Sequence, residues 1–320
     1  MLFEQQYLSL MLDVISYGQD RLDYSGAKVR SIFGRMLTVD LNLEFPILIT
    51  NYVDWSQCLR ELLWMLSGNT NIKRLQARGI HTFDSLADKN GDLGPTHGVQ
   101  WRRVLGSDQS GFVSFQEDQL GNAIKLLQAD PFSTRHVVSA WNVTQVSEMR
   151  LLPTDYVFQF YVDYTDTSTL EKPNYRLNCI LHIRSSNLPV SLPSTVLNYS
   201  ALLIMIAKQL GYHPGELKLT IGDSQVYEKH IDLVMTQNER IYKNFCNSTS
   251  MSDDYLNRCS ESSFMGKHFQ KNGLAYPLHG NGPKFIIEQS FKSTLKSKIE
   301  DFNIIDYNPI KPYIDYQMSV

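Results

Sequence analysis

The sequence predicts an α+β fold, in which helices and strands are mixed without strict alternation. Apolar residues recur at helical spacing in three segments, and five other segments are rich in β-branched and aromatic residues. The chain has 320 residues and the apolar and charged fractions of an ordinary globular protein. We therefore expect one domain over residues 1–320 with a substantial buried core.

Three helices are expected from the apolar stripes. The first covers Leu8–Ile15 and ends before Gly18, a residue type that commonly stops a helix. The second runs near 54–67, where tryptophan and leucine side chains form one face. The third runs near 198–211 and ends at Gly211. Each stripe indicates a helix that packs one face against the core.

Five strands and two polar segments complete the prediction. The expected strands are His136–Trp141, Tyr156–Val162, Leu177–Arg184, Leu217–Gly222 and Phe285–Glu288. The polar residues 163–174 lie between two of these strands and predict a long hairpin connection. Residues 246–283 are rich in Ser, Asn, Asp, Gly and His, which predicts a surface insertion.

Charge and cysteine usage narrow the classes of function. The net charge is −3 and no run of Lys or Arg occurs, so duplex nucleic acid is not an expected partner. The four cysteines lie far apart without metal-ligand spacing, so no metal site is expected and a reducing cytosol is indicated. The apolar start contains Glu4 and Asp13, which favours an amphipathic helix over a signal peptide. No stretch approaches the roughly 20 apolar residues of a membrane span, so we expect a cytoplasmic protein without a membrane partner.

Several short stretches, in a fixed order from about Gln6 to Ile241, resemble the thymidylate synthases and the related deoxycytidylate hydroxymethylases. The earlier ones are Ser31–Gly34, Phe45–Pro46, Glu61–Trp64, Gly68–Asn71, Gly91–Pro95 and Gly98–Arg102. The later ones are Ser139–Asn142, Phe158–Val162, Arg184–Ser185, Gly222–Asp223 and Tyr227 with His230, and Asp301–Phe302 and Tyr307–Pro309 resume the pattern near the end. A single dipeptide of this kind means little, but so many collinear motifs are hard to obtain by chance.

The resemblance implies a three-layer α/β fold and a homodimer packed sheet on sheet. It also implies nucleotide biosynthesis by a methyltransferase with a pocket for a pyrimidine nucleoside monophosphate. Above that pocket it implies a site for methylenetetrahydrofolate, closed by the C-terminal residues. In the family's chemistry a cysteine thiolate adds to C6 of the pyrimidine, and C5 then attacks the one-carbon unit. A thiolate suits this step because it is a strong nucleophile that can also leave again.

The position that resembles the family's nucleophile carries Thr154 instead of cysteine, and Asp155 follows it instead of histidine. Pro153 and Gln159 fix this alignment without a gap. A threonine hydroxyl is too basic to ionise near neutral pH unless a base activates it, and its methyl group crowds the approach. Thr154 is therefore expected to be a non-reactive pocket residue, with a substitute nucleophile as the alternative.

The phosphate clamp that the resemblance implies is incomplete. Family enzymes hold the phosphate with four arginines, two from each subunit, and Arg184 and Arg135 match two of these positions. Tyr24 and Thr134 stand where the other two are expected, and Ser185 follows Arg184 as in the family pattern. Two charged donors fewer imply weaker phosphate binding. The alternative is that both arginines form structural ion pairs.

The groups that read the base also differ from the family pattern. Thr195 replaces the asparagine that reads the pyrimidine edge, and Asn187 replaces an aspartate of the base site. A hydroxyl offers one donor and acceptor group where an amide offers two, so uracil specificity does not follow. The Asn198 side chain could turn into the space left by the replaced asparagine, or it could face the edge of the core. Asp223 matches the family, whereas Gln225 replaces a histidine that contacts the sugar.

The remaining differences lie where the resemblance implies the catalytic and folate contacts. His97 replaces a tyrosine of the catalytic site, and Phe83 and Leu86 replace two tryptophans of the folate site. Asn51 and Tyr52 stand where a Lys-Arg pair is expected to hold folate and phosphate. Methylenetetrahydrofolate is thus implied by the family, but its contacts are poorly matched and no cofactor is certain.

Glu61 and Tyr227 match family residues of the catalytic site, where the glutamate organises proton transfers around the base. A glutamate on an amphipathic helix could also be merely solvated, but its motif favours the pocket. Cys58 lies one helical turn before Glu61, and we expect it to be a buried structural cysteine.

Three functions remain open from the sequence. The first is a nucleotide-processing enzyme with altered chemistry, in which Glu61, His97 and Asp155 supply acid–base groups for one-carbon transfer by a changed route or for glycosidic-bond hydrolysis. The second is an inactive pseudoenzyme that serves as a binding, regulatory or structural dimer. The third is a folate-dependent methyl- or hydroxymethyltransferase acting on dUMP or dCMP, against which Thr154 argues.

Overall fold

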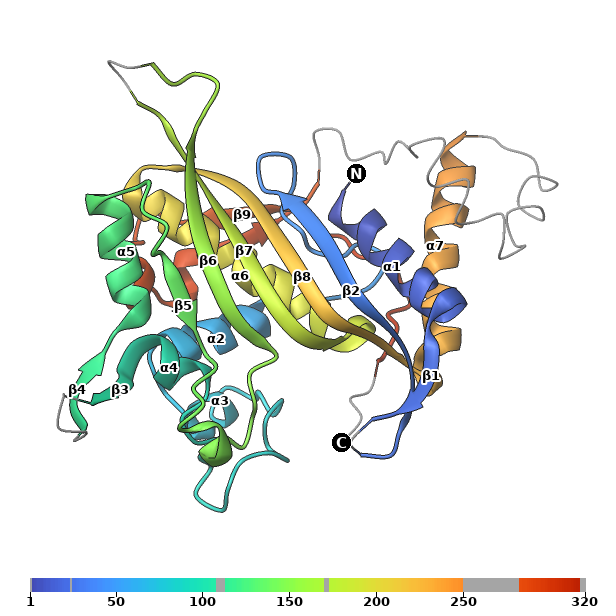
Figure 1. The fold of residues 1–320 in the computed structure, drawn as a ribbon. Coiled ribbons are helices and arrows are strands. Elements are labelled where there is room, and N and C mark those ends of the chain that lie inside the picture. Colours follow the sequence, from blue (N-terminus) through green and yellow to red (C-terminus); the bar gives the residue numbers. More distant parts are fainter. Residues whose placement is uncertain (1, 24, 108–112, 170–172, 250–281, 317–320) are drawn as a thin grey trace.

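The structure is a computed structural model that describes residues 2–23, 25–107, 113–169, 173–249 and 282–316. A six-stranded mixed sheet forms its centre (Figure 1). In spatial order its strands are β1 (Gln19–Leu22), β2 (Lys28–Asp40), β8 (His213–Tyr227), β7 (Tyr175–Asn187), β6 (Asp155–Tyr164) and β5 (Val137–Ser139). Neighbouring strands are antiparallel except β7 and β8, which are parallel. The predicted α/β fold class is confirmed.

Three helices cover one face of the sheet. Helices α6 (Leu188–Leu210) and α2 (Trp55–Leu66) lie behind the strands in Figure 1, and α1 (Phe3–Tyr17) packs against β2 and β8. The three helices predicted from apolar stripes are therefore present, and α1 ends at Gly18 as expected.

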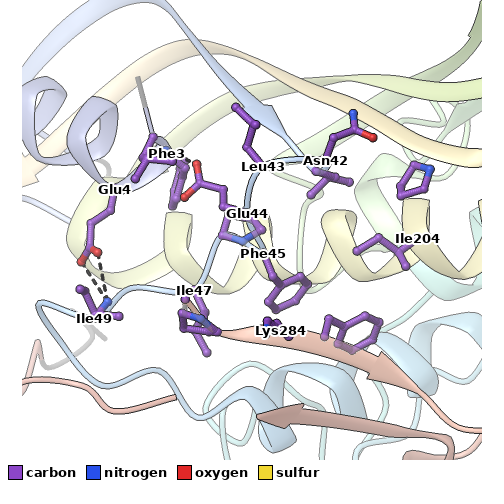
Figure 2. Close-up of a pocket in the computed structure, with 17 residues that line it drawn as sticks. Phe3, Glu4, Asn42, Leu43, Glu44, Phe45, Ile47, Ile49, Ile204 and Lys284 are labelled. Atoms are coloured by element: carbon purple, nitrogen blue, oxygen red, sulfur yellow. Dashed lines mark hydrogen bonds between the residues drawn. The ribbon is translucent and has the colours of Figure 1, made fainter. Parts of the chain in front are cut away.

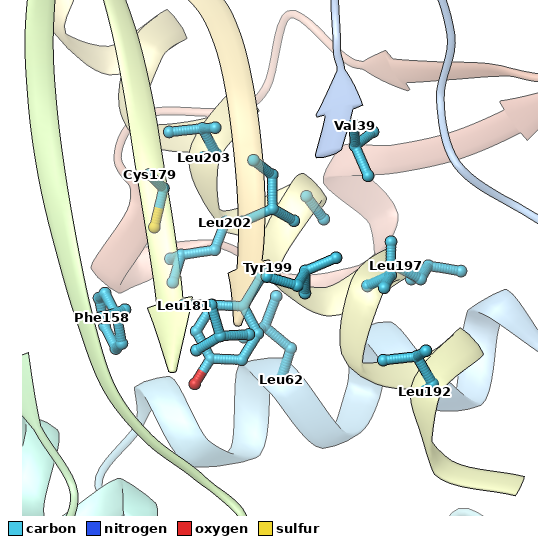
Figure 3. Close-up of a cluster of buried hydrophobic side chains, with 14 of the residues drawn as sticks. Val39, Leu62, Phe158, Cys179, Leu181, Leu192, Leu197, Tyr199, Leu202 and Leu203 are labelled. Carbon is cyan, nitrogen blue, oxygen red and sulfur yellow. The ribbon is translucent and has the colours of Figure 1, made fainter. Parts of the chain in front are cut away.

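The main core lies between this face of the sheet and the helices. Figure 3 shows Phe158 of β6 and Leu181 of β7 directed toward Leu62 of α2 and toward Tyr199 and Leu202 of α6. Each of these side chains is at most 4% exposed. Burial at this level makes apolar contact the main stabilising term of the fold.

The strands alternate between this core and the opposite face of the sheet. Along β6, Phe158, Phe160 and Val162 are buried, whereas Tyr161 between them is 62% exposed. Phe33 of β2 is 86% exposed. No helix covers this second face in Figure 1, so the described part of the sheet presents large apolar side chains to the outside.

Helix α6 begins ten residues earlier than the predicted start at 198. Pro189 lies in its first turn, where a missing N–H costs nothing, and Pro193 lies inside the helix. The helix ends as expected at Gly211, whose φ of 73° is left-handed. By length and composition α6 could cross a membrane, but 72% of its most apolar window is buried inside the protein. Its apolar character is accounted for by its central position in the core.

The remaining elements surround this core. They are α3 (Lys73–Gln76), α4 (His97–Arg103), α5 (Gln119–Ala129), α7 (Ile231–Thr249), β3 (Val104–Ser107), β4 (Val113–Glu117), β9 (Lys284–Ile287) and β10 (Phe302–Ile305), with short 3-10 turns at Val146–Glu148, Glu228–His230, Thr294–Lys296 and Ile299–Asp301. The hairpin between β6 and β7 and all five predicted strands are confirmed. The predicted insertion at 246–283 falls largely on residues 250–281, outside the described residues, and stays a prediction.

Candidate active site

A cavity of about 730 Å³ opens beside α2, α4, the start of β6 and the first half of α6. Among the residues predicted to act in catalysis or nucleotide binding, Glu61, His97, Thr154 and Thr195 line it. They come from four separate parts of the chain, and the crossover through α6 brings Thr195 to the same space as the other three. The fold thus brings part of the predicted site together.

Asp155 is the centre of the polar groups at the inner wall. Its Oδ1 accepts hydrogen bonds from His97 Nε2 at 3.0 Å and from Thr154 Oγ1 at 3.1 Å. Its Oδ2 accepts one from the Tyr199 hydroxyl at 2.7 Å. Burial acts to raise the pKa of Asp155, but the charge and hydrogen bond of His97, the Tyr199 hydroxyl and the Asp155 backbone N–H outweigh it and hold the pKa below its usual value. Asp155 is therefore a stable carboxylate and a weak base.

His97 has an acceptor beside each ring nitrogen. Nε2 faces Asp155, and Nδ1 lies 3.2 Å from Thr96 Oγ1. The Thr96 hydroxyl donates its one proton to the Leu151 carbonyl oxygen at 2.8 Å, so its oxygen is left to accept. The surroundings therefore accommodate an imidazolium ring, paired with Asp155 at the cavity wall.

Glu61 is a buried carboxyl group on α2 and not a solvated surface residue. The residue is 8% exposed, and its Oε1 accepts hydrogen bonds from Thr82 Oγ1 at 2.6 Å and from Gln57 Nε2 at 3.1 Å. Burial raises its pKa and outweighs the two donors. Glu61 can therefore keep a proton at a pH where an exposed glutamate has lost it.

Arg184 and Ser185 lie just outside the cavity, on β7. The Arg184 guanidinium donates to the Pro153 carbonyl oxygen at 2.9 Å, to the Leu152 carbonyl oxygen at 3.4 Å and to Ser185 Oγ at 3.2 Å. Leu152 itself lines the cavity. These bonds fix the charge of Arg184 beside the segment that leads to Thr154.

Asp223, Gln225 and Tyr227 form a further polar group at the end of β8, and none of them lines the cavity. Asp223 accepts from Gln225 Nε2 at 2.6 Å and is ion-paired with Arg21. The Tyr227 hydroxyl donates to Asp23 Oδ2 at 2.5 Å. Asp223 stands opposite Ser185 in the β7–β8 pairing, which connects this group to Arg184. The predicted site residues thus fall into an inner group at the cavity and an outer group at the strand ends.

Arg135 is separate from both groups. It is exposed, and its Nε approaches Ser133 Oγ at 3.4 Å, immediately before β5. It does not line the cavity of its own chain. Its predicted role in a partner's pocket stays a prediction, and Tyr24 lies outside the described residues.

Asn51 and Tyr52 contact the C-terminal segment through Ile314 and Tyr313. Asn51 Nδ2 donates to the Ile314 carbonyl oxygen at 3.0 Å, and the Ile314 N–H donates to Asn51 Oδ1 at 2.8 Å. The Tyr52 ring stacks on Tyr313 with centroids 4.9 Å apart. Both residues line the cavity. The family resemblance implies charged ligand contacts at these two positions, but here Asn51 and Tyr52 contact Ile314 and Tyr313 of the same chain.

The folate wall that the resemblance implies is only partly present. Phe83 lines the cavity and stacks on Trp64 with ring centroids 5.9 Å apart. Leu86 does not line the cavity and is 37% exposed. One aromatic ring therefore stands where the family pattern implies two.

Cys58 and Cys179 are free and buried. Cys58 lines the cavity, but burial and the neighbouring Glu61 and Asp54 carboxyls raise the pKa of its thiol far above the usual value. Burial raises the pKa of the Cys179 thiol as well. Neither provides a thiolate at neutral pH.

Sequence reasoning missed Tyr199, Thr82 and Gln57 as partners of the buried carboxyl groups. Tyr199 stood in the predicted apolar stripe, where its ring packs in the core while its hydroxyl reaches Asp155. A tyrosine in an otherwise aliphatic stripe was the available signal, because a buried tyrosine hydroxyl requires a partner.

Figure 2 shows a second cavity, of about 430 Å³, which holds none of the predicted site residues. Glu44 lies in its wall and accepts a hydrogen bond from the Phe3 backbone N–H at 2.5 Å. Burial raises the pKa of Glu44 to about 7. Phe45, Ile47 and Phe285 supply apolar walls.

Comparison with known protein families gives a match over most of the chain. Residues 5–264 match the family model for thymidylate synthase. The matched range contains every residue that lines the large cavity and every predicted site residue.

Proposed function

Because the chain belongs to the thymidylate synthase family, we propose that its large cavity binds a pyrimidine nucleoside monophosphate. The family's enzymes are methyltransferases of nucleotide biosynthesis that act on a pyrimidine nucleotide, which supports a role in nucleotide metabolism. The observation that carries the proposal is the convergence of Glu61, His97, Thr154 and Thr195 on one cavity of about 730 Å³. That volume lies within the usual range for small-molecule sites.

The phosphate requires positive charge from outside the cavity wall. Among the described residues that line the cavity there is no lysine or arginine. Arg184 stands at the edge, and we propose that Arg135 of a second subunit supplies the other charge. The uncovered sheet face with Phe33 and Tyr161 supports a homodimer packed sheet on sheet, because such large apolar side chains favour burial.

The proposed site lacks a thiolate for attack at C6 of the base. Thr154 occupies the position that the resemblance gives to the nucleophile, and its proton is donated to Asp155. Asp155 is a weak base because of its lowered pKa, so it does not activate the hydroxyl. The ordinary conversion of dUMP to dTMP is therefore not expected, and the simplest function is nucleotide binding without that chemistry.

A second candidate, acid–base chemistry on the bound nucleotide, is favoured by one observation. The environments of Glu61 and Asp155 shift their pKa values in opposite directions, upward for Glu61 and downward for Asp155. A protonated and an ionised carboxyl group at one cavity can serve as acid and as electrostatic stabiliser. His97 beside Asp155 adds a third proton-carrying group.

Calorimetric titration of the intact protein with uridine, cytidine, thymidine and purine monophosphates tests the proposal. We expect a pyrimidine monophosphate to bind with micromolar to millimolar affinity that weakens with added salt, because charge-assisted contacts dominate. Arg184→Ala should remove most of the affinity, and Arg74→Ala, an exposed arginine of α3 that does not line the cavity, is the matched control. Absence of binding across the panel, or equal binding by Arg184→Ala, contradicts the proposal.

A further inference from the structure

We propose that Asn198 reads the hydrogen-bonding edge of the bound base, in place of Thr195. The inference rests on the proposed function and specifies the ligand further. The base must present a donor and an acceptor side by side, as the N3–C4 edge of a pyrimidine does.

Ser191, Thr195 and Asn198 form one polar stripe of α6. They are separated by four and three residues, which places them on the same helix face, and all three line the large cavity. The stripe faces the same space as Glu61 and His97. A ligand in this cavity meets these side chains on its α6 side.

Thr195 is unable to donate to such a ligand. Its Oγ1 donates to the Ser191 carbonyl oxygen at 3.0 Å, within the helix. A hydroxyl group has one proton, so only its acceptor capacity is left. The position that the resemblance gives to the base-reading residue is thus already committed to the helix backbone.

Unlike Thr195, the Asn198 side chain has no hydrogen-bond partner within the described part of the protein. The residue is 7% exposed, and its side-chain oxygen is sealed from solvent without a hydrogen-bond partner. Throughout the described ranges no contact engages its amide nitrogen either. Buried polar groups are nearly always hydrogen-bonded, so an unpartnered amide at a cavity wall points to a group that the bound state supplies.

The chemistry of the amide defines that group. An asparagine side chain offers one acceptor oxygen and an NH₂ donor, and a half-turn exchanges the two. Uracil presents N3–H and a carbonyl oxygen at its edge, whereas cytosine presents N3 and an amino group. When its side chain turns so that both groups face the cavity, Asn198 can pair with either base through two hydrogen bonds. It cannot pair in this way with a base whose N3 carries a methyl group.

The test is calorimetric titration with deoxyuridine monophosphate and its N3-methyl analogue, combined with thermal unfolding of the ligand-free proteins. Asn198→Ala should bind deoxyuridine monophosphate at least tenfold more weakly than the wild type, and Thr195→Val should lose less affinity than Asn198→Ala. The wild type should bind the N3-methyl analogue at least tenfold more weakly, whereas Asn198→Ala should hardly distinguish the two ligands, since the methyl group and the substitution remove the same contact.

The unfolding temperature separates ligand recognition from a structural role. Without ligand, Asn198→Ala should unfold at the same or a higher temperature than the wild type, because the substitution removes an unpartnered buried polar group. Ser200→Ala is the matched control, since Ser200 lies on the same helix, is equally sealed and unpartnered, and does not line the cavity. It should bind the nucleotide as the wild type does.

Three results would overturn the inference. Equal affinity of Asn198→Ala and wild type for deoxyuridine monophosphate would show that the amide does not read the base, while the proposed function would stand. A clear drop in the unfolding temperature of ligand-free Asn198→Ala, without a drop for Ser200→Ala, would show a structural role. Failure of the wild type to bind any nucleoside monophosphate would remove both the inference and the proposed function.

Discussion

At the scale of single residues, the chemistry of the cavity depends on how Asp155 is held. Three donors, from His97, Thr154 and Tyr199, surround a carboxylate whose side chain is 14% exposed. A buried charge is stable only when it is paired and hydrogen-bonded, and here both oxygens are satisfied. Asp155 therefore positions His97 and Thr154 instead of activating them.

Removing the Asp155 carboxylate should destabilise the fold. Asp155→Ala leaves His97 and Tyr199 without their shared acceptor, and we expect the free energy of unfolding to fall by about 3 kcal/mol. Tyr199→Phe removes one donor only and should cost about 1 kcal/mol. Urea denaturation followed by circular dichroism measures both. Equal losses in the two variants would show that Asp155 is not the centre of the group.

Glu44 should make stability fall as pH rises. Its folded-state pKa, about 7, lies above the usual value of 4.5, so between these values the folded protein holds more protons than the unfolded chain. The associated stability is fully present below about pH 4.5 and is lost as pH rises through about 7. Glu44 is half-buried, so screening reduces the effect to about 1–2 kcal/mol.

Glu44→Gln should remove this dependence while keeping an acceptor for the Phe3 N–H. Relative to the wild type, the variant should gain stability between pH 5 and pH 8. Glu228→Gln is the control, because Glu228 is exposed and forms only a surface ion pair with Lys28. It should leave the dependence of stability on pH unchanged. Parallel stability–pH curves for wild type and Glu44→Gln would rule out the raised pKa.

At the scale of helices and strands, the sequence predicted those elements whose own pattern is regular. The second half of α6 has an uninterrupted apolar stripe and was predicted, whereas its first half contains Pro189 and Pro193 and was not. Strand β2 was missed because charged residues interrupt it and Gly34, with φ of 71°, breaks its alternation. Its position is set by pairing with β8 along eleven residue pairs, which local sequence does not reveal.

The C-terminus of α6 offers a test of element geometry. Gly211 has a left-handed backbone with φ of 73°, although a Cβ at this position would meet no atom within 4 Å. Gly211→Ala should therefore lower the free energy of unfolding by about 1 kcal/mol through backbone strain alone. Gly211→Asn should cost less, because asparagine tolerates this conformation. Thermal unfolding compares them, and a neutral Gly211→Ala would contradict the assigned helix end.

Only some residues of the candidate site could be predicted, because the site forms where distant helices and strands meet. Glu61 was identified because it lies within a motif that resembles the family, and His97, Thr154 and Thr195 because each stands where the family pattern has another residue. The partners Tyr199, Thr82 and Asn51 were not identified as such, because their roles depend on contacts across 21 to 263 residues of chain. A motif in the sequence identifies which positions belong to the site, but only the fold shows which side chains form hydrogen bonds with them.

At the scale of the whole molecule, the account requires two subunits. The uncovered sheet face carries Tyr161, and no arginine is among the described residues that line the cavity of one chain. Light scattering at micromolar concentration should show a dimer. Tyr161→Glu should weaken it, because a charge would be buried at the interface. Tyr17→Glu, at another exposed tyrosine, the last residue of α1, should not weaken the dimer. A monomeric wild type would contradict the proposed assembly.

The central claim is that a pyrimidine nucleotide is bound but is not attacked by a thiolate. It is tested most directly by carbon-13 NMR of deoxyuridine monophosphate labelled at C6, added to the intact protein. The account predicts that the C6 signal broadens and shifts slightly on binding but stays in the range of a double-bonded carbon. Since Thr154 donates its proton to Asp155 and the Cys58 and Cys179 thiols are buried, no adduct should form. An unchanged signal would contradict binding, and a C6 signal in the range of a saturated carbon would contradict the loss of nucleophilic chemistry.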